Sequence, residues 1–217
     1  TVMLAVISLL MILICSVPLG LLCARGAGGV LDHAVNQILQ TVMAVPSFFL
    51  GILLTYAFGL VLHWFQPGQF VEPSESFFGA ASYLVFPALA VALPKIAMVV
   101  KFLRNAVLSE LSKDYVRTAK SRGNSSRRIL YVHVLKNAMI PVITFTAMVV
   151  AEILAGSIIV EQVFSVPGVG RLLISSIFNR DYPVVQAIVM YITLVVVAVN
   201  FLVDFMYQLL DPRVRTS

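Results

Sequence analysis

The chain has 217 residues, of which 60% are hydrophobic and only 12% are charged. A water-soluble domain of this composition would expose large apolar patches, so we expect a single membrane domain. The net charge of +5 does not indicate binding to nucleic acid, because the basic residues gather in one stretch between apolar segments.

Five apolar segments follow one another along the chain, each about as long as a helix needs to be to cross a bilayer. We therefore expect an all-α integral membrane domain over residues 1–210, followed by a short tail. Its transmembrane helices are predicted at residues 2–24, 38–64, 83–103, 138–160 and 184–210. Pro46 predicts a kink in the second helix. Pro87 and Pro94 make the third helix the least regular of the set.

The distribution of basic residues predicts which loops face the cytoplasm. Residues 101–136 contain nine Lys or Arg residues against two acidic ones, and Lys and Arg near short loops resist translocation. This stretch is therefore predicted to be cytoplasmic, together with the turn at Arg25 and the tail at residues 211–217. The connections at residues 66–76 and 161–182 are then external. The first residue also falls outside, so we expect a further helix to precede it and the intact protein to have six spans.

Within the basic stretch, the sequence predicts two short helices joined by a glycine. The first begins near Asp114 and stops at Gly123, which suits a left-handed C-terminal position. Asn124, Ser125 and Ser126 offer an N-cap for the second helix, which runs into the fourth span. Two helices that meet at a glycine, anchored to two spans, would form a rigid projecting elbow. The alternative is a solvated loop that merely follows the positive-inside rule.

Three separated motifs resemble those of one family, in the same order. The motifs lie at residues 115–123 with 133–138 and Pro141, at residues 160–171, and at residues 179–186, and the resemblance ends at residues 210–213. The first is similar to the EAA loop of binding-protein-dependent ABC importer permeases. The whole pattern resembles the dipeptide, oligopeptide and nickel branch of that family, which implies a type I ABC importer transmembrane domain.

The chain departs from the general EAA motif of that family. Arg117, Thr118 and Ala119 stand where the motif begins Glu-Ala-Ala, and only Ala119, Gly123 and Leu135 match it. This pattern of substitution is similar to that of the peptide and nickel branch, so it favours that branch within the family.

The resemblance implies a transport subunit whose loop at residues 114–137 docks a separate ATPase. The coupling residues carried over are Asp114, Tyr115, Val116, Arg117, Thr118, Ala119, Lys120, Gly123 and Ser125. The implied partners are a second similar permease, two ATP-binding subunits and an extracytoplasmic solute-binding protein, in the plasma membrane of a bacterium or archaeon. The implied cargo is a di- or oligopeptide, with nickel or a metal chelate as the alternative.

The chain carries no phosphate-binding loop of the form G-x-x-x-x-G-K-[ST], so we do not expect it to bind or hydrolyse ATP. It is predicted to be no enzyme, with ATP and Mg²⁺ held by the partner subunits. His33, His63 and His133 lie in different predicted regions without paired spacing, so we expect neither a metal site nor a cofactor.

Charged residues inside the spans are candidates for the translocation path, because each costs about 2.5–3.5 kcal/mol at the centre of a membrane helix. They are Lys95, Glu152 and Asp204, and Asn200 shares a helix face with Asp204. Lys95 and Asp204 are each predicted about 10 Å inward from the cytoplasmic boundary, so they are expected to pair. Glu152 is predicted nearer the external half.

Two alternatives remain open for these charges. One is that they only hold helices together, and the other is that they form a proton or ion relay in a secondary transporter, a different class of protein.

Overall fold

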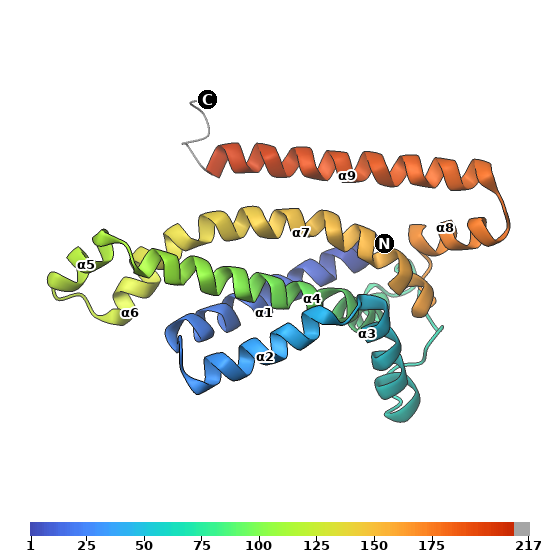
Figure 1. Cartoon of the computed structure of the whole chain (residues 1–217). Coiled ribbons are helices and arrows are strands. Elements are labelled where there is room, and N and C mark those ends of the chain that lie inside the picture. Colours follow the sequence, from blue (N-terminus) through green and yellow to red (C-terminus); the bar gives the residue numbers. More distant parts are fainter. Residues whose placement is uncertain (211–217) are drawn as a thin grey trace.

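The computed structural model describes residues 1–210, without the side chains of Ala155, Asp204 and residues 206–210. Its elements in that range are helices, and most of the long ones pack side by side (Figure 1). The elements are α1 (Val2–Arg25), α2 (Val30–Ala44), α3 (Ser47–Leu54), the π-helical η1 (Thr55–Val61), α4 (Phe77–Leu111), α5 (Asp114–Ser121), α6 (Ser126–Arg128), the π-helical η2 (Ile129–Val134), α7 (Leu135–Val163), α8 (Val169–Phe178) and α9 (Tyr182–Leu210).

Within residues 1–210, four continuous helical stretches are long and apolar enough to cross a membrane, namely α1, α4, the run from α6 into α7, and α9. The bent pair formed by α2 and α3 with η1 makes a fifth if it is counted as one span. Large apolar side chains such as Leu10, Ile14 and Leu194 are exposed on the outer helices, as a bilayer requires. The predicted all-α membrane architecture is therefore confirmed.

The predicted second span is not a kinked helix but two helices that meet at nearly a right angle. α2 begins at Val30, well before the predicted start at residue 38, and the angle between α2 and the following helix is 99°. Pro46 explains the break, because its ring disfavours a helical conformation at the preceding residue. Val45 accordingly has an extended backbone, with φ of −91° and ψ of 124°.

α4 is the central helix of the bundle and was wrongly predicted to be the least regular. It continues from Phe77 to Leu111 through both Pro87 and Pro94, and it packs against α1, α2, α3 and α7. Neighbouring helices can compensate for the hydrogen bond that each proline removes, which is why such helices persist in membrane proteins. At roughly 52 Å, α4 is longer than a hydrocarbon core of about 30 Å and must extend beyond it.

Segments predicted to share one side of the membrane lie at the same end of the bundle (Figure 1). At the predicted cytoplasmic end, the guanidinium group of Arg25 lies 3.4 Å from the hydroxyl of Tyr131. At the other end, the hydroxyl of Tyr83 donates to the carbonyl of Phe164 at 2.6 Å and accepts from the amide of Gly68 at 2.9 Å. The packing thus agrees with the alternation of loops derived from charge.

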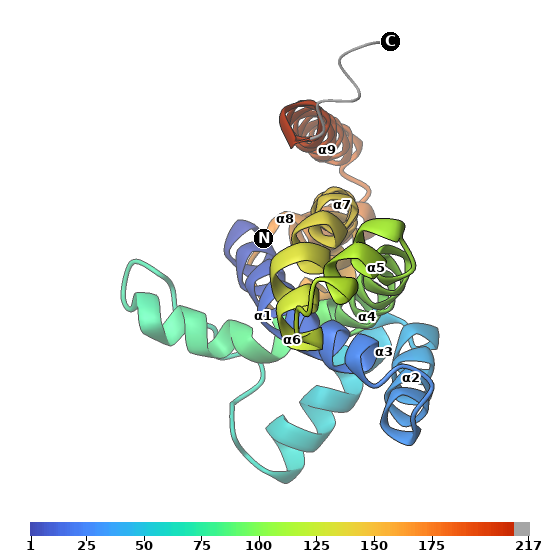
Figure 2. The same cartoon turned by 90° about the vertical axis from the view of Figure 1, so that its left-hand side faces the viewer.

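α9 stands apart from the other spans when the bundle is viewed from the end that carries α5 (Figure 2). In the part of the chain that the structure describes, α9 packs mainly against α7 and α8. Apolar side chains along it, including Leu194, Val197 and Phe201, are exposed. In a membrane such a surface faces lipid or another apolar chain.

Candidate functional site

Residues 114–137, predicted to dock an ATPase, fold as an elbow that projects from one end of the bundle (Figure 1). Gly123 takes the left-handed conformation, with φ of 79°, where a side chain would be strained. Asn124 closes the turn, because its Nδ2 donates to the carbonyl of Ala119 at 3.0 Å. Ser125 caps the next helix, since its Oγ accepts from the amide of Arg128 at 3.4 Å. The predicted glycine joint and serine cap are confirmed.

The first helix of the elbow, α5, has one face against the bundle and one in solvent. Val116 and Ala119 are buried. On the outer face, the side chains of Asp114 and Arg117 are 97% and 81% exposed and lie 3.7 Å apart. The other candidate residues on the exposed surface are Thr118, Lys120, Gly123 and Ser125. Val116 and Ala119 therefore hold α5 against the bundle and contribute almost nothing to its exposed surface.

Tyr115 joins the elbow to both of the spans that carry it. Its hydroxyl donates to Oε2 of Glu110, near the end of α4, at 2.8 Å, and it also hydrogen-bonds with Asn137, near the start of α7. Burial raises the pKa of the Tyr115 hydroxyl, so it stays protonated at neutral pH. The ammonium group of Lys113 pairs with Glu110 as well. Tyr115 thus fastens α5 to the ends of both α4 and α7.

The solvent-facing surface of the elbow is strongly basic. Besides Arg117 and Lys120, its exposed basic residues are Arg122, Arg127, Arg128 and Lys136. A surface of this charge suits a partner that presents acidic residues, because complementary potentials guide and orient association.

Lys95 of α4 forms an ion pair with Glu152 of α7, which we call the central ion pair. This partner differs from the predicted one, Asp204, whose side chain lies outside the described residues. Glu152 was predicted nearer the external half, and it lies 17 residues from the start of α7 and 11 from its end. Because Lys95 pairs with Glu152, it lies at the depth of that residue and not near the cytoplasmic boundary where it was predicted. Asn200, the remaining candidate, is exposed on α9.

The central ion pair joins the middle of α4 to the second half of α7 and is open to one side. Lys95 is 18 residues from the start of α4 and 16 from its end. The side chain of Glu152 is 51% exposed and that of Lys95 is 20% exposed. Charges at the centre of a membrane are unfavourable against lipid, so this side must face water or another protein chain. That is the property required of a wall of a translocation path.

A second ion pair, between Asp32 of α2 and Arg104 of α4, was not predicted. The guanidinium of Arg104 donates to both carboxylate oxygens of Asp32, at 2.7 and 2.6 Å. Asp32 also accepts from the amide of Gly28 at 2.9 Å and from Nδ2 of Asn36 at 2.8 Å. The pair fixes α2 against α4 at the predicted cytoplasmic end. A sequence signal existed only for Asp32, which is the single acidic residue before Glu72, whereas Arg104 is one of nine basic residues in the stretch 101–136.

The motif at residues 160–171 folds around the buried side chain of Glu161, another residue that sequence reasoning missed. Its Oε2 accepts from the amides of Gly170, at 2.8 Å, and Arg171, at 3.4 Å, at the start of α8. A Cβ at Gly168 would collide with this carboxylate, and one at Gly170 would collide with the backbone of Ile158. The motif is thus a helix cap that needs both glycines, and it has a structural rather than a chemical role.

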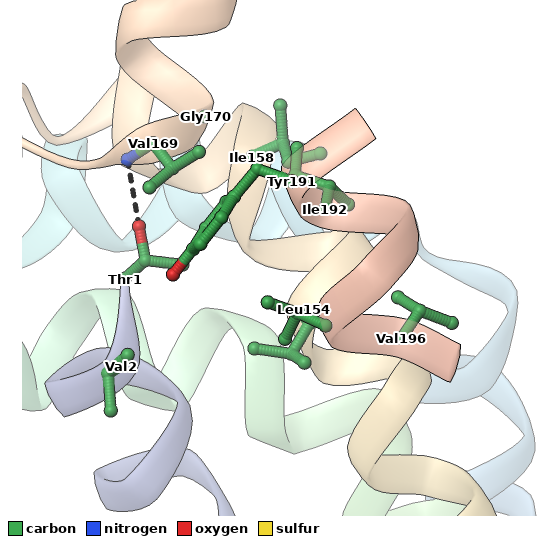
Figure 3. Close-up of a pocket in the computed structure, with 10 residues that line it drawn as sticks. Thr1, Val2, Leu154, Ile158, Val169, Gly170, Tyr191, Ile192 and Val196 are labelled. Carbon is green, nitrogen blue, oxygen red and sulfur yellow. Dashed lines mark hydrogen bonds between the residues drawn. The ribbon is translucent and has the colours of Figure 1, made fainter. Parts of the chain in front are cut away.

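Two cavities of the structure are apolar, and neither is lined by Lys95 or Glu152. A pocket of about 50 Å³ lies where α7, α8 and α9 meet the start of α1. Beside it the amide of Val169 donates to Oγ1 of Thr1 at 2.9 Å (Figure 3). A larger cavity of about 390 Å³ lies between α1, α4, α7 and α9. Neither is lined by a charged residue, so neither suits a polar solute.

Comparison with known families and proteins gives a consistent result. Residues 16–216 match the family described as "Binding-protein-dependent transport system inner membrane component". The chain is 32% identical over 217 residues to the oligopeptide transport system permease protein AppB of Bacillus subtilis (strain 168), covering 99% of this chain and 69% of that protein.

Two further relatives are similar at the same level. One is the di/tripeptide transport system permease protein DppB of Pseudomonas aeruginosa (strain UCBPP-PA14), 35% identical over 216 residues, with 90% of this chain and 64% of the relative covered. The other is the dipeptide transport system permease protein DppB of Bacillus subtilis (strain 168), 34% identical over 197 residues, with 91% of this chain and 61% of the relative covered. The chain thus spans less than two thirds of the length of these two relatives.

Proposed function

Because the chain belongs to the family of binding-protein-dependent transport system inner membrane components, we propose that it is the permease subunit of an ATP-driven importer of short peptides. It is a multi-pass protein of the inner membrane. The relatives described above are named for oligopeptides, di/tripeptides and dipeptides, which favours peptides over nickel or a metal chelate as cargo.

The observation that carries this proposal is the exposed, basic outer face of α5. In it, Asp114, Arg117, Thr118 and Lys120 would contact an ATPase subunit, while Val116 and Ala119 hold the helix against the bundle. Tyr115 links α5 to the ends of both α4 and α7. An elbow of this kind is suited to carry force from a soluble partner into two spans at once.

The mechanism we propose is alternating access. The chain forms half of a path, and a second similar permease supplies the other half. Two ATP-binding subunits hold ATP and Mg²⁺, and their closure around ATP pushes the elbows. A solute-binding protein delivers the cargo from outside. Lys95 and Glu152, and with them Asn200 and Asp204 on α9, are the candidates for contact with the moving solute.

The test is a pair of charge reversals on the elbow in the intact complex. Arg117→Glu with Lys120→Glu should release the ATPase in a pull-down assay and lower ATP-dependent peptide uptake into proteoliposomes by at least tenfold. The reason is that the reversals change the electrostatic potential of the docking face without touching the core. The matched control is Glu72→Lys with Glu75→Lys, two reversals in the exposed loop at the opposite end, which should leave the ATPase bound.

Two results would contradict the proposal. An ATPase that stays bound to the elbow variant with full affinity would exclude this face as the docking surface. Uptake by the wild-type complex that continues when ATP hydrolysis is blocked would instead favour an ion-coupled secondary transporter.

A further inference from the structure

The central ion pair belongs to a continuous face formed by α4 and α7. Phe102 of α4 stacks on Phe145 of α7, with ring centroids 4.4 Å apart and planes 6° from parallel. Phe102 lies seven residues after Lys95, and Phe145 lies seven residues before Glu152. Because the two helices are antiparallel and seven residues make two turns, both pairs bridge the helices on the same side, roughly 10 Å apart.

Two methionines complete this face. Met98 follows Lys95 by three residues, and Met148 precedes Glu152 by four, so each lies on the side that carries the ion pair. Met148 is 60% exposed, and the two phenylalanines are half-buried. Methionine adapts its shape to different apolar partners, which suits a surface that meets side chains of varied size. We call the six residues on these two helices the α4–α7 face.

The charges of the α4–α7 face match those of a peptide with free ends. Such a peptide carries one ammonium and one carboxylate group, and the face offers one carboxylate and one ammonium group. In a poorly hydrated path, an unpaired charge is strongly unfavourable, whereas an exchange of partners leaves every charge paired. A zwitterion can therefore enter without leaving a bare charge behind.

On these grounds we propose that the central ion pair exchanges partners with the peptide, so that Lys95 binds the terminal carboxylate and Glu152 binds the terminal ammonium. This inference rests on the proposed function and adds a specificity-determining site to it. Met98 and Met148 contact the peptide's side chains. The stacked phenylalanines lie on the cytoplasmic side of the site and separate it from the elbow end of the path.

The test compares uptake of two probes by the complete complex in proteoliposomes. The probes are trialanine and trialanine amide, which differ only in the terminal carboxylate, each supplied in amounts that saturate the solute-binding protein. The measured quantity is the ratio of amide uptake to trialanine uptake. The preference of the solute-binding protein is the same in every complex, so it cancels when a variant is compared with the wild type.

Lys95→Met should raise this ratio about tenfold, because only trialanine loses a partner. Glu152→Gln should lower uptake of both probes and leave the ratio unchanged, because both probes keep the ammonium group. Lys101→Met removes another lysine from α4 on a different side and is the matched control, which should leave the ratio unchanged. A residue that merely holds helices together would affect both probes equally.

If the complex with Lys95→Met fails to assemble, the double variant Lys95→Met with Glu152→Gln is measured instead. The double variant leaves no unpaired charge in the protein and should also raise the ratio about tenfold. An unchanged ratio in either variant would overturn the exchange site while leaving the importer assignment intact. Failure of the wild-type complex to take up either probe with ATP would overturn the proposed function itself.

Discussion

The ion pair between Asp32 and Arg104 should respond unequally to loss of its two partners. The side chain of Asp32 is only 2% exposed, whereas that of Arg104 is 21% exposed. Arg104→Met leaves a carboxylate enclosed in protein with two neutral donors, from Gly28 and Asn36. Asp32→Asn leaves a guanidinium group that can reach water. We therefore expect the first substitution to destabilise the protein more than the second.

The expected magnitudes follow from burial. Removal of one partner of a buried ion pair typically destabilises by about 3–5 kcal/mol, which applies to Arg104→Met. The partly exposed guanidinium that remains after Asp32→Asn brings the expected loss down to about 1–3 kcal/mol. The double variant has no charge left to bury, so it should be more stable than Arg104→Met alone.

The measurement is the free energy of unfolding of the purified permease in mixed micelles, for the wild type, both single variants and the double variant. A double-mutant cycle isolates the coupling between the two side chains. Equal losses for the two single variants, or losses that simply add in the double variant, would refute the reasoning, because they would show that the carboxylate does not depend on Arg104.

Two further outcomes test the packing at the other end of the bundle. Gly170→Ala should lower the unfolding free energy by about 1–3 kcal/mol, because a Cβ there collides with the backbone of α7; Gly156→Ala, with open space at that position, is the control and should cost little. Tyr83→Phe removes two hydrogen bonds and should cost about 1–3 kcal/mol and increase protease cleavage of the loop at residues 66–76. Tyr182→Phe, at an exposed position, is its control, and equal cleavage in both variants would contradict this role.

Some features of the candidate site could be predicted from the sequence and others could not. The elbow could be read from single residues, because a glycine in the left-handed conformation and a serine N-cap are local devices. The division of α5 into contact residues and supporting residues could not be predicted, since the burial of Val116 and Ala119 depends on how α5 lies on the bundle. The role of Glu161 was hidden as well, because its carboxylate acts on amides of a different helix.

The sequence by itself determined the membrane class, the succession of apolar segments and their alternation across the bilayer, since hydropathy and the placement of Lys and Arg act segment by segment. Only the tertiary structure decided which charges meet. Partner choice depends on the depth and rotation at which two helices pack, and hydropathy specifies neither. The packing of α4 against α7 places Lys95 opposite Glu152, which no local pattern could have shown.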